Sequence, residues 1–268
     1  MPTPAVQDQD GPAHASGGAT GLRTVTLAER PDLASAVPAV LASRWPAFML
    51  AARAEHGLML GELLAAVAQH QILLVDQRDQ VLAAALSVPL SWDRTVDGLP
   101  PGWDGAVSRA ADLAARGGRP NAVATLSITM TPAAAGRGLA ARMLDGVRAA
   151  AAARDIDALI APVRPVLKAQ YPLTTMASYL SWRTPDGEVF DPWLRMHLRL
   201  GGVQVGIAYP SRTLRGPVAA WEEWAELPLP AAGEYVIPGG LVPLTVDRRA
   251  DLATYREPAV WFVHRTAA

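Results

Sequence analysis

The stretch ATLSITMTPAAAGRGLAARMLDGV, residues 124–147, joins three patterns that together indicate the fold. Apolar and polar residues alternate up to Met130, as in a half-buried β-strand. A run of small residues follows, and apolar residues then recur four apart, as on one face of an amphipathic helix. The apolar residues of this face are Leu139, Met143 and Val147. The sequence therefore predicts a strand over 122–130, a glycine turn and a helix over 138–154.

The turn between this strand and this helix predicts an anion site. The first N–H groups of a helix have no acceptor within the helix, and the helix dipole favours negative charge there. Glycine and alanine let a phosphate reach the backbone without meeting a large side chain. The residues of the loop are Ala135, Gly136, Arg137, Gly138, Leu139 and Ala140. A plain strand-to-helix turn in an alanine-rich chain is the alternative that these residues leave open.

Two common phosphate-binding motifs fit this loop poorly. A P-loop has Lys and then Ser or Thr after its second glycine, where this chain has Leu139 and Ala140. Residues 136–141 match the Rossmann pattern G-x-G-x-x-A, but that motif needs an acid at the end of the next strand to hold a ribose. The nearby acids, Asp155 and Asp157, precede that strand. The loop also follows an antiparallel hairpin instead of opening a parallel unit, so the sequence argues against both motifs.

The remaining patterns predict a mixed α/β fold. Two apolar runs within 71–88 flank the polar turn DQRDQ, which favours an antiparallel hairpin, and 158–163 reads as a further strand. Residues 91–120 are rich in Gly, Pro and Asp and read as an insertion over the sheet. Asp191 and Pro192 open a helix that a glycine pair ends. A strand and two helices are expected before the hairpin, over 22–27, 29–45 and 61–70.

Composition excludes several classes of protein. The 268 residues are 50% hydrophobic, enough for a sizeable core, and the formal net charge of −1 gives no basic face for nucleic acid. The chain has no cysteine, so disulfides, thiolate metal sites and a cysteine nucleophile are excluded. No apolar run approaches the ~18 residues of a membrane span, and residues 1–20 lack the regions of a signal peptide. We therefore expect a cytoplasmic protein that contacts neither nucleic acid nor membrane.

The segment MTPAAAGRGLAARML resembles motif A of the GNAT superfamily, the GCN-type N-acetyltransferases. Members typically have a strand end, x-Pro, and R/Q-x-x-G-x-G/A. Here Met130 ends the strand, Pro132 is the proline, and residues 135–140 form the pyrophosphate loop. Ala135 replaces the usual Arg or Gln, which removes one side-chain contribution to cofactor binding. The order of elements over roughly residues 22–210 also resembles the family, and RMHLRLGGVQVG is similar to its late glycine segment.

The resemblance implies a fold and a domain organisation. It implies a mixed sheet with antiparallel N-terminal strands and a splayed parallel pair, flanked by helices. We expect a disordered tail over 1–20 and an acyl-CoA-binding domain over 21–215 with the insertion 91–120. We expect residues 216–268 to form a C-terminal extension packed on the same domain.

The resemblance also implies an activity. It implies an acyl-CoA-dependent N-acyltransferase, most simply an N-acetyltransferase, that moves the acyl group directly to the amine of a small molecule. Acetyl-CoA or another acyl-CoA would be the cosubstrate, with no metal. In the family the pantetheine arm pairs with the motif strand like an added strand, so Ile128 and Met130 would offer backbone groups here. The sequence leaves open whether the chain forms a homodimer.

The resemblance suggests a general acid, but the sequence does not identify the general base. In the family a tyrosine about seven residues past the second parallel strand often acts as the general acid that protonates the departing thiolate. That position is Tyr171 here, and Tyr179 is the second choice. The motif strand carries no carboxylate, so the general base is not visible, although Glu188 and Asp191 flank a loop on the expected acceptor side. His197 in LRMHLRL is either a half-buried structural histidine, which the pattern favours, or a base.

Three other side chains are candidates for the acceptor region. Arg164 follows the second parallel strand and would bind an acidic substrate group, form a salt bridge or have only a surface role. Trp221 and Trp224 lie three apart on one helix face, a spacing that indicates packing or one wall of an apolar acceptor pocket.

Two other functions remain open from the sequence. The missing strand carboxylate and the polar residues Thr125, Ser127 and Thr129 are compatible with a GNAT-like protein of altered chemistry, either an acyl-CoA decarboxylase or a transferase to a carrier-protein thiol. Ala135 and the missing base are also compatible with a CoA-binding sensor that performs no catalysis.

Overall fold

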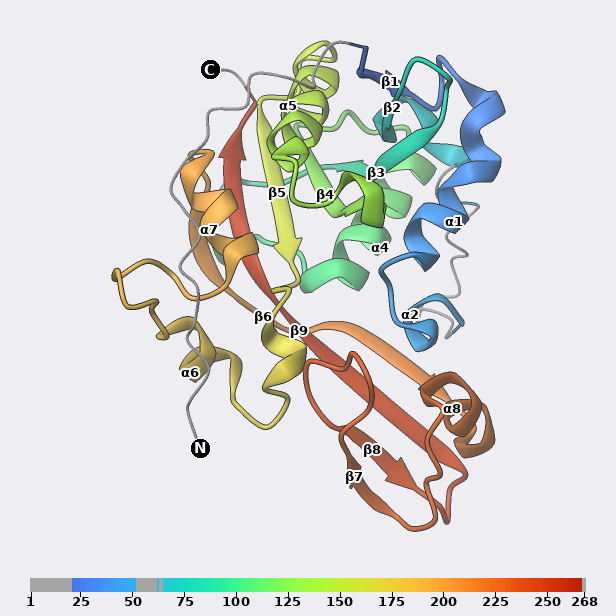
Figure 1. Ribbon diagram of the computed structural model, residues 1–268. Coiled ribbons are helices and arrows are strands. Elements are labelled where there is room, and N and C mark those ends of the chain that lie inside the picture. Colours follow the sequence, from blue (N-terminus) through green and yellow to red (C-terminus); the bar gives the residue numbers. More distant parts are fainter. Residues whose placement is uncertain (1–20, 52–61, 63–64, 267–268) are drawn as a thin grey trace, which may run out of the picture.

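The computed structural model describes residues 21–51, 62 and 65–266 of the chain. Within these residues nine strands form one sheet in the order β1-β2-β3-β4-β5-β9-β8-β7, and β6 pairs with β9 (Figure 1). The strands are β1 (Arg23–Thr26), β2 (Ile72–Val75), β3 (Val81–Leu90), β4 (Ala122–Met130), β5 (Ala158–Val163), β6 (Val203–Gly216), β7 (Gly233–Tyr235), β8 (Leu244–Asp247) and β9 (Leu252–Arg265). Strands β1 to β4 are antiparallel and β4–β5 is parallel, which confirms the predicted mixed α/β fold.

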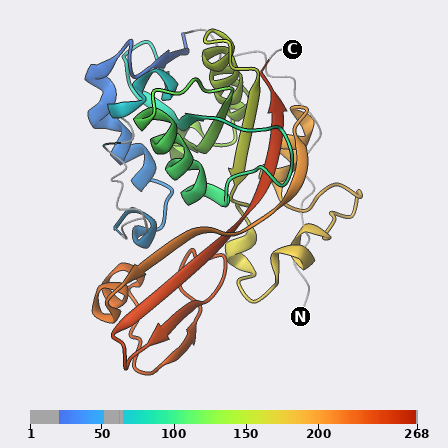
Figure 2. The ribbon, with the colours of Figure 1, turned by 180° about the vertical axis from the view of Figure 1, so that it is seen from behind.

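Helices cover both faces of this sheet (Figures 1 and 2). Helices α5 (Leu139–Ala152) and α7 (Pro192–Arg199) pack on one face, and α1 (Val37–Ala42) and α4 (Gly102–Ala115) pack on the other. The shorter helices are α2 (Ala47–Ala51), α6 (Met176–Leu180), α8 (Val218–Ala225) and the 3₁₀ turns η1 (Pro31–Ala36), η2 (Ala68–His70), η3 (Pro132–Ala134) and η4 (Lys168–Gln170). The central strands are therefore buried on both faces, which accounts for their long apolar runs.

Alternation along β4 divides the core between the two faces. Val123 belongs to the apolar cluster that contains Met143 of α5, whereas Ala124 belongs to the cluster that contains Val107 of α4. Successive side chains of a strand point to opposite faces, so one strand contributes to both clusters.

The parallel pair β4–β5 separates after a short contact. It is paired only from Ala122 to Ala124 on β4, where Ala124 lies opposite Ile160. A register shift against β3 follows at once and leaves Leu126 as an extra residue on β4. Such a bulge bends a strand and increases its twist. On β5, Pro162 has no N–H to donate to a neighbouring strand. The bulge at Leu126 and the missing N–H of Pro162 thus both favour separation of β4 from β5.

The regions before and after the parallel pair match the expected elements to different degrees. The first predicted helix is a 3₁₀ turn that becomes α1 next to Pro38. The second, over 61–70, lies partly outside the described residues, which show η2 at its end. Within 91–120, α4 packs against β3 and β6. Residues 166–182 form only η4 and α6, because Pro172 separates the two and Thr175 caps α6 by accepting a hydrogen bond from Ser178 N.

Two strands of 14 residues each connect the sheet to the C-terminal region. β9 lies between β5 and β6, so the end of the predicted extension 216–268 is a central strand of the sheet. Between these strands, α8, β7 and β8 form a small unit at the far end of the pair, seen at the bottom of Figure 1. Trp221 is fully buried there against Phe48 and Tyr255, so it packs a core.

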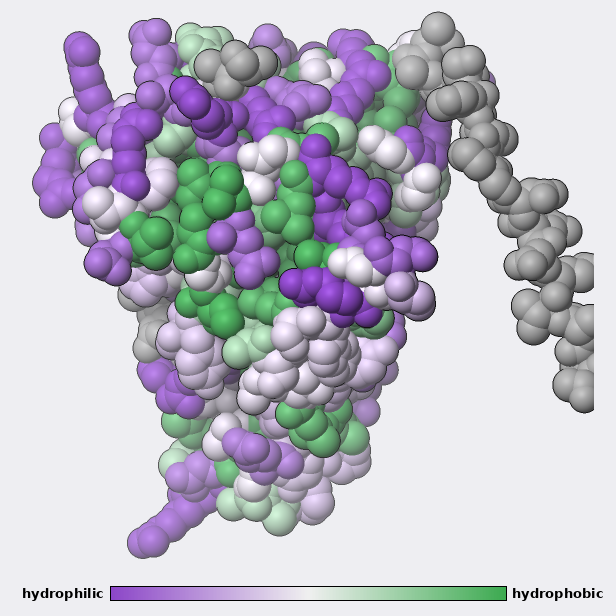
Figure 3. Space-filling view, turned by 90° about the vertical axis from the view of Figure 1, so that its left-hand side faces the viewer, coloured by the Kyte–Doolittle hydropathy of each residue, from purple (hydrophilic) through white to green (hydrophobic). Residues whose placement is uncertain are grey.

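The surface next to β6 is partly apolar. Val203, Ile207 and Leu198 of α7 are large exposed apolar residues of this region. The side of the molecule at the left of Figure 1 shows hydrophobic surface between hydrophilic residues in Figure 3. Among the described residues, no helix has the length and apolar character that crossing a bilayer requires.

Candidate active site

A cavity of about 660 Å³ lies where β4 and β5 separate. Six successive residues of β4, from Thr125 to Met130, line it, together with residues 161–164 at the end of β5. Since neighbouring side chains of a strand point to opposite faces, a cavity that meets all six reaches both faces of the sheet. One part lies near α5 and α7, here called the donor side, and the other lies near α2 and α4, here called the acceptor side. The cavity can therefore bring together two molecules that enter from opposite faces.

The glycine loop closes the donor side. Gly136 and Gly138 have positive φ angles of 75° and 68°, and Gly138 is the N-cap of α5. A Cβ at either glycine would meet no atom within 4 Å, so the space above the loop is open. The N–H groups of Leu139 and Ala140 donate to no described residue. The loop thus presents free donors at the N-terminus of a 14-residue helix, the arrangement that binds phosphate groups.

Most of the predicted cofactor residues line this cavity. They are Ile128, Met130, Ala135, Gly136, Gly138, Leu139 and Ala140. The exception is Arg137, which is exposed and does not contribute to the lining. Seven of the eight predicted cofactor residues therefore line one cavity, and their contact with a cofactor stays a prediction.

A chain of two histidines leads from α5 to the cavity. Arg148 Nη2 lies 2.9 Å from His264 Nδ1, and His264 Nε2 lies 2.9 Å from His197 Nδ1. A guanidinium can only donate, so His264 Nδ1 accepts, its Nε2 carries the proton, and His197 Nδ1 accepts in turn. This pattern assigns the remaining proton to His197 Nε2. His197 lines the cavity, and no described residue accepts from its Nε2–H.

Both histidines are neutral at ordinary pH. His197 is 2% exposed, and burial, aided by the neighbouring His264 and Arg148, lowers its pKa to about 3. Burial and Arg148 lower the pKa of His264 to about 4. His197 can therefore offer a hydrogen bond to a ligand without carrying a charge.

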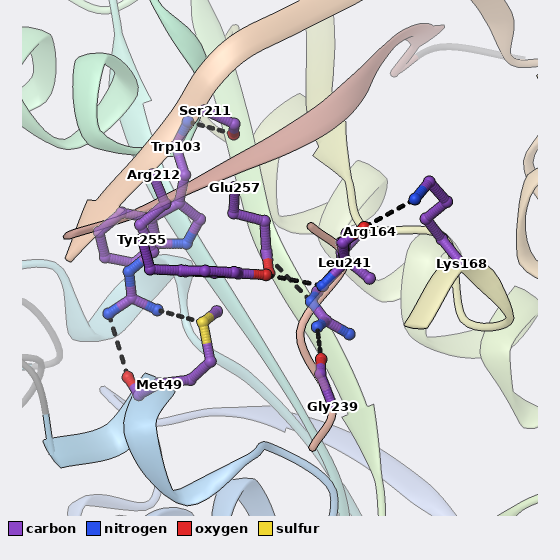
Figure 4. A network of polar contacts seen from close by, with 10 residues as sticks. All are labelled: Met49, Trp103, Arg164, Lys168, Ser211, Arg212, Gly239, Leu241, Tyr255 and Glu257. Atoms are coloured by element: carbon purple, nitrogen blue, oxygen red, sulfur yellow. Dashed lines mark hydrogen bonds and ion pairs between the residues drawn. The ribbon is translucent and has the colours of Figure 1, made fainter. Parts of the chain in front are cut away.

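The acceptor side contains a buried carboxylate. Glu257 of β9 is 4% exposed and is the only acid among the described residues that line the cavity. Arg164 Nε donates to its Oε1 at 2.9 Å, and Tyr255 Oη donates to its Oε2 at 2.6 Å (Figure 4). Tyr255 Oη itself accepts from Leu241 N at 2.7 Å. Two donors thus hold Glu257 in one orientation at the cavity wall.

The C-terminal unit supports this carboxylate. Arg164 Nη2 donates to Gly239 O at 2.5 Å, which ties the guanidinium to the loop before β8. Burial alone would lower the pKa of Arg164, but the charge of Glu257 and their hydrogen bond outweigh it and raise that pKa. Burial and Glu257 raise the pKa of Tyr255 well above its usual value, so its hydroxyl remains a donor.

A second arginine lies beside this pair. Arg212 of β6 is directly opposite Glu257 of β9 in the strand register. Its guanidinium lies 4.5 Å from the ring centre of Trp103 and 5.8 Å from that of Trp45. Arg212, both tryptophans and Met49 line the acceptor side. Two arginines, one carboxylate and apolar walls therefore form this end of the cavity.

The structure does not bring the predicted tyrosines to the cavity. The ring of Tyr171 packs edge-on against those of Trp182 and Phe190, with ring centroids 4.8 Å and 5.9 Å apart. Tyr171 does not line the cavity. Tyr179 is buried and donates to Asp191 Oδ2 at 2.7 Å. The acid role of Tyr171 remains a sequence-based prediction.

The two acids named from the sequence have other contacts. Asp191 is buried and caps α7, accepting from the backbone N–H groups of Trp193 and Leu194. Glu188 forms an exposed ion pair with Arg199 at 3.1 Å. Neither lines the cavity. No group of three or more acids and histidines among the described residues is placed to hold a metal ion.

Sequence reasoning missed Glu257 and Arg212. Both are charged residues inside otherwise strand-like segments, TYREPAVWFVH and IAYPSRTLRG. A charged residue within a buried strand requires a partner, and this was the available signal. Arg164 forms a salt bridge with Glu257, which is one of the roles that the sequence leaves open for it.

Comparisons with known proteins agree with this architecture. No family model matches the sequence. The arginine N-acetyltransferase avaD of Aspergillus versicolor is 29% identical, over 91% of this chain and 94% of that protein.

Two solved structures share the fold. The loading GNATL domain of CurA from Lyngbya majuscula has a TM-score of 0.53 at 13% identity, covering 91% of this chain and 96% of that one. The GNAT-like decarboxylase GphF, solved with isobutyryl-CoA, has a TM-score of 0.54 at 19% identity, covering 91% and 98%. The separated parallel pair and the glycine loop at α5 thus belong to a fold that this chain shares with these two GNAT-like structures.

Proposed function

We propose that this chain transfers an acyl group, most simply acetyl, from acyl-CoA to an amine of a small molecule. One observation carries the proposal: a single cavity passes between β4 and β5 with a helix N-terminus on one side and a buried carboxylate, Glu257, on the other. This arrangement suits a donor with a pyrophosphate and an acceptor that must lose a proton. The relative named as an arginine N-acetyltransferase supports the same reaction class.

The donor side would hold acyl-CoA mainly through the backbone. The loop 135–140 and the first turn of α5 would bind the pyrophosphate. The edge of β4 that has left β5 offers unpaired backbone groups, and Ile128 and Met130 lie on it. A pantetheine arm with its two amides can add to such an edge as a strand does. A β4 N–H near the thioester oxygen would stabilise the negative charge that develops there.

The acceptor side would activate the amine. The nitrogen bonds to the thioester carbonyl carbon and loses a proton to Glu257, the carbon–sulfur bond breaks, and CoA leaves as a thiolate that takes up a proton. Arg164 and Tyr255 keep Glu257 oriented. The Nε2–H of His197 would stabilise the departing sulfur by a hydrogen bond, since this donor lies within the cavity.

Thiol release from acetyl-CoA, with and without amines such as arginine and agmatine, tests the proposal directly. We expect release that depends on the amine and a product heavier by one acetyl group. Thiol release that does not depend on the amine would support hydrolysis or decarboxylation. Decarboxylase is the activity named for one structure of the same fold. Thermal stabilisation by CoA without any release would support a sensor.

A further inference from the structure

The acceptor side contains a buried cation that forms no ion pair with any residue that the structure describes. Arg212 is 8% exposed. Its Nη2 donates to Met49 O at 3.2 Å and its Nη1 lies 4.0 Å from Met49 Sδ, while its Nε is buried without a partner (Figure 4). No carboxylate of the described residues lies within ion-pair distance of it. Much of the donor capacity of this guanidinium is thus unused.

The surrounding charges do not remove this imbalance. Burial lowers the pKa of Arg212, Asp104 and Glu257 act through space to raise it, and Arg164 lowers it. Asp104 accepts a hydrogen bond from Thr213 N at 2.7 Å. Glu257 is already held by Arg164 and Tyr255. A buried charge without a partner is costly, and an arginine presents a fork of donors that matches a carboxylate.

The two strands place this cation next to the proposed base. Arg212 and Glu257 face each other across β6 and β9. An α-amino acid carries its carboxylate and its amine on one carbon, so its head group has the same adjacent pair of opposite charges. Trp45, Trp103 and Met49 supply apolar walls beside it. An amine that lacks a carboxylate would add a positive charge to a wall that already holds two arginines.

We infer that the acceptor is a free α-amino acid, whose carboxylate binds Arg212 and whose α-amine faces Glu257 and receives the acyl group. This inference rests on the proposed acyltransfer and adds the class of acceptor and the nitrogen that reacts. The chemistry is that of the proposed function: the new bond joins the α-nitrogen to the acyl carbon, and the thiol of CoA is released.

Matched acceptor pairs test the inference. Arginine and agmatine, and likewise phenylalanine and phenethylamine, differ only in the carboxylate. With the full chain and saturating acetyl-CoA, we expect kcat/KM at least about a hundredfold higher for an acid than for its decarboxylated partner, because one ionic contact is lost. Mass spectrometry of the arginine product should place the acetyl group on the α-nitrogen.

Variants of Arg212 separate recognition from folding. Met has a similar length without charge, and apolar replacement of a buried charge is often tolerated. Arg212→Met should raise KM for the amino acid at least tenfold and so reduce the acid-to-amine ratio of kcat/KM by about the same factor, whereas Arg212→Lys should keep part of the preference for the acid. The CoA-induced thermal shift should persist in both variants and shows that they fold.

Several outcomes would overturn the inference. Equal turnover of acid and amine, an equal loss for both in Arg212→Met, or acetylation on the guanidino group would each do so while leaving acyltransfer intact. If no acceptor of either kind reacts but acetyl-CoA loses its acyl group without an amine, the proposed function fails and the inference fails with it.

Discussion

The donor and acceptor sides of the cavity are built in opposite ways. The donor side is continuous in sequence: β4, the loop 135–140 and α5 follow one another, and the groups that matter there are backbone N–H groups. The acceptor side is assembled from four distant segments around Met49, Trp103, Arg212 and Glu257, and the groups that matter are buried charged side chains. A shared cosubstrate can be recognised by a local backbone motif, whereas an acceptor of one chemical class requires side chains that only the fold brings together.

The largest expected effect is on the acceptor side. Glu257→Gln removes the proposed base while keeping the shape of the side chain and an oxygen that can accept from Tyr255. We expect kcat/KM for the amine to fall by about 10³, within the usual range for general base catalysis, with CoA binding retained. Steady-state kinetics and a CoA thermal shift measure the two effects separately.

Glu188→Gln is the matched control. Glu188 is one of the two acids that the sequence placed near the acceptor side, but it forms an exposed ion pair and does not line the cavity. Its replacement should therefore change kcat/KM by less than twofold. A folded Glu257→Gln variant with more than a tenth of normal activity would show that another group accepts the proton.

The next largest effect is on the donor side. Gly138→Asp places a negative charge where the pyrophosphate should bind, and aspartate tolerates positive φ better than most residues. We expect CoA affinity to fall by about 100-fold or more. The thermal shift that CoA produces in the original chain should disappear, since that shift follows from binding to the folded state.

A second glycine controls for backbone strain. Gly187 has a similar positive φ of 81° and open space around it, but it does not line the cavity. Gly187→Asp should keep the full CoA shift. Equal loss in both variants, or retained CoA binding in Gly138→Asp, would mean that the loop 135–140 is only a turn.

A smaller effect should distinguish His197 from Tyr171. His197→Asn removes the Nε2–H yet keeps an oxygen near the position of Nδ1 that can accept from His264. We expect kcat to fall about tenfold, because a thiolate of pKa near 8.5 is already a fair leaving group. Tyr171→Phe, which lies outside the cavity lining, should change kcat by less than about threefold. The reverse order of effects in folded proteins would restore Tyr171 as the acid.

The smallest effect concerns pH and stability. Burial lowers the pKa of His197 to about 3 and of His264 and His70 to about 4, from 6.5. The folded state then binds fewer protons than the unfolded chain below pH 6.5. The contribution of the three neutral histidines to the free energy of unfolding is therefore fully present above pH 6.5 and is lost as the pH falls toward 4. Each histidine contributes up to about 1.4 kcal/mol per pH unit in this window.

Urea denaturation between pH 7 and pH 4 tests this sign. The double variant His197→Gln/His264→Gln should show a shallower fall in unfolding free energy than the original chain, because only His70 of the three remains. A slope that does not change would assign the pH dependence to other groups.

The sequence predicted the donor side far better than the acceptor side, for physical reasons. Strand alternation, positive-φ glycines and a helix start are local patterns, so β4 matches its predicted bounds and the loop lies at the cavity. Tyr171 was predicted from its distance along the chain past the second parallel strand, and such a distance does not fix a position in space where η4, Pro172 and the Thr175 cap redirect the chain. Glu257 and Arg212 lie 45 residues apart and meet only because β6 pairs with β9 after the C-terminal unit has been inserted between them. Such a pairing has no local signature.

The insertion between β6 and β9 has an evolutionary consequence. Its ends lie next to each other, since Gly216 and Ala253 are partners across the two strands. A segment with adjacent ends can be lengthened, shortened or exchanged without rerouting the rest of the chain. Yet this segment supplies Gly239 O to Arg164 and Leu241 N to Tyr255, the two residues that orient Glu257. Exchange of this one segment would therefore change how Glu257 is held, while β4, the loop 135–140 and α5 lie in another part of the chain and would keep their structure.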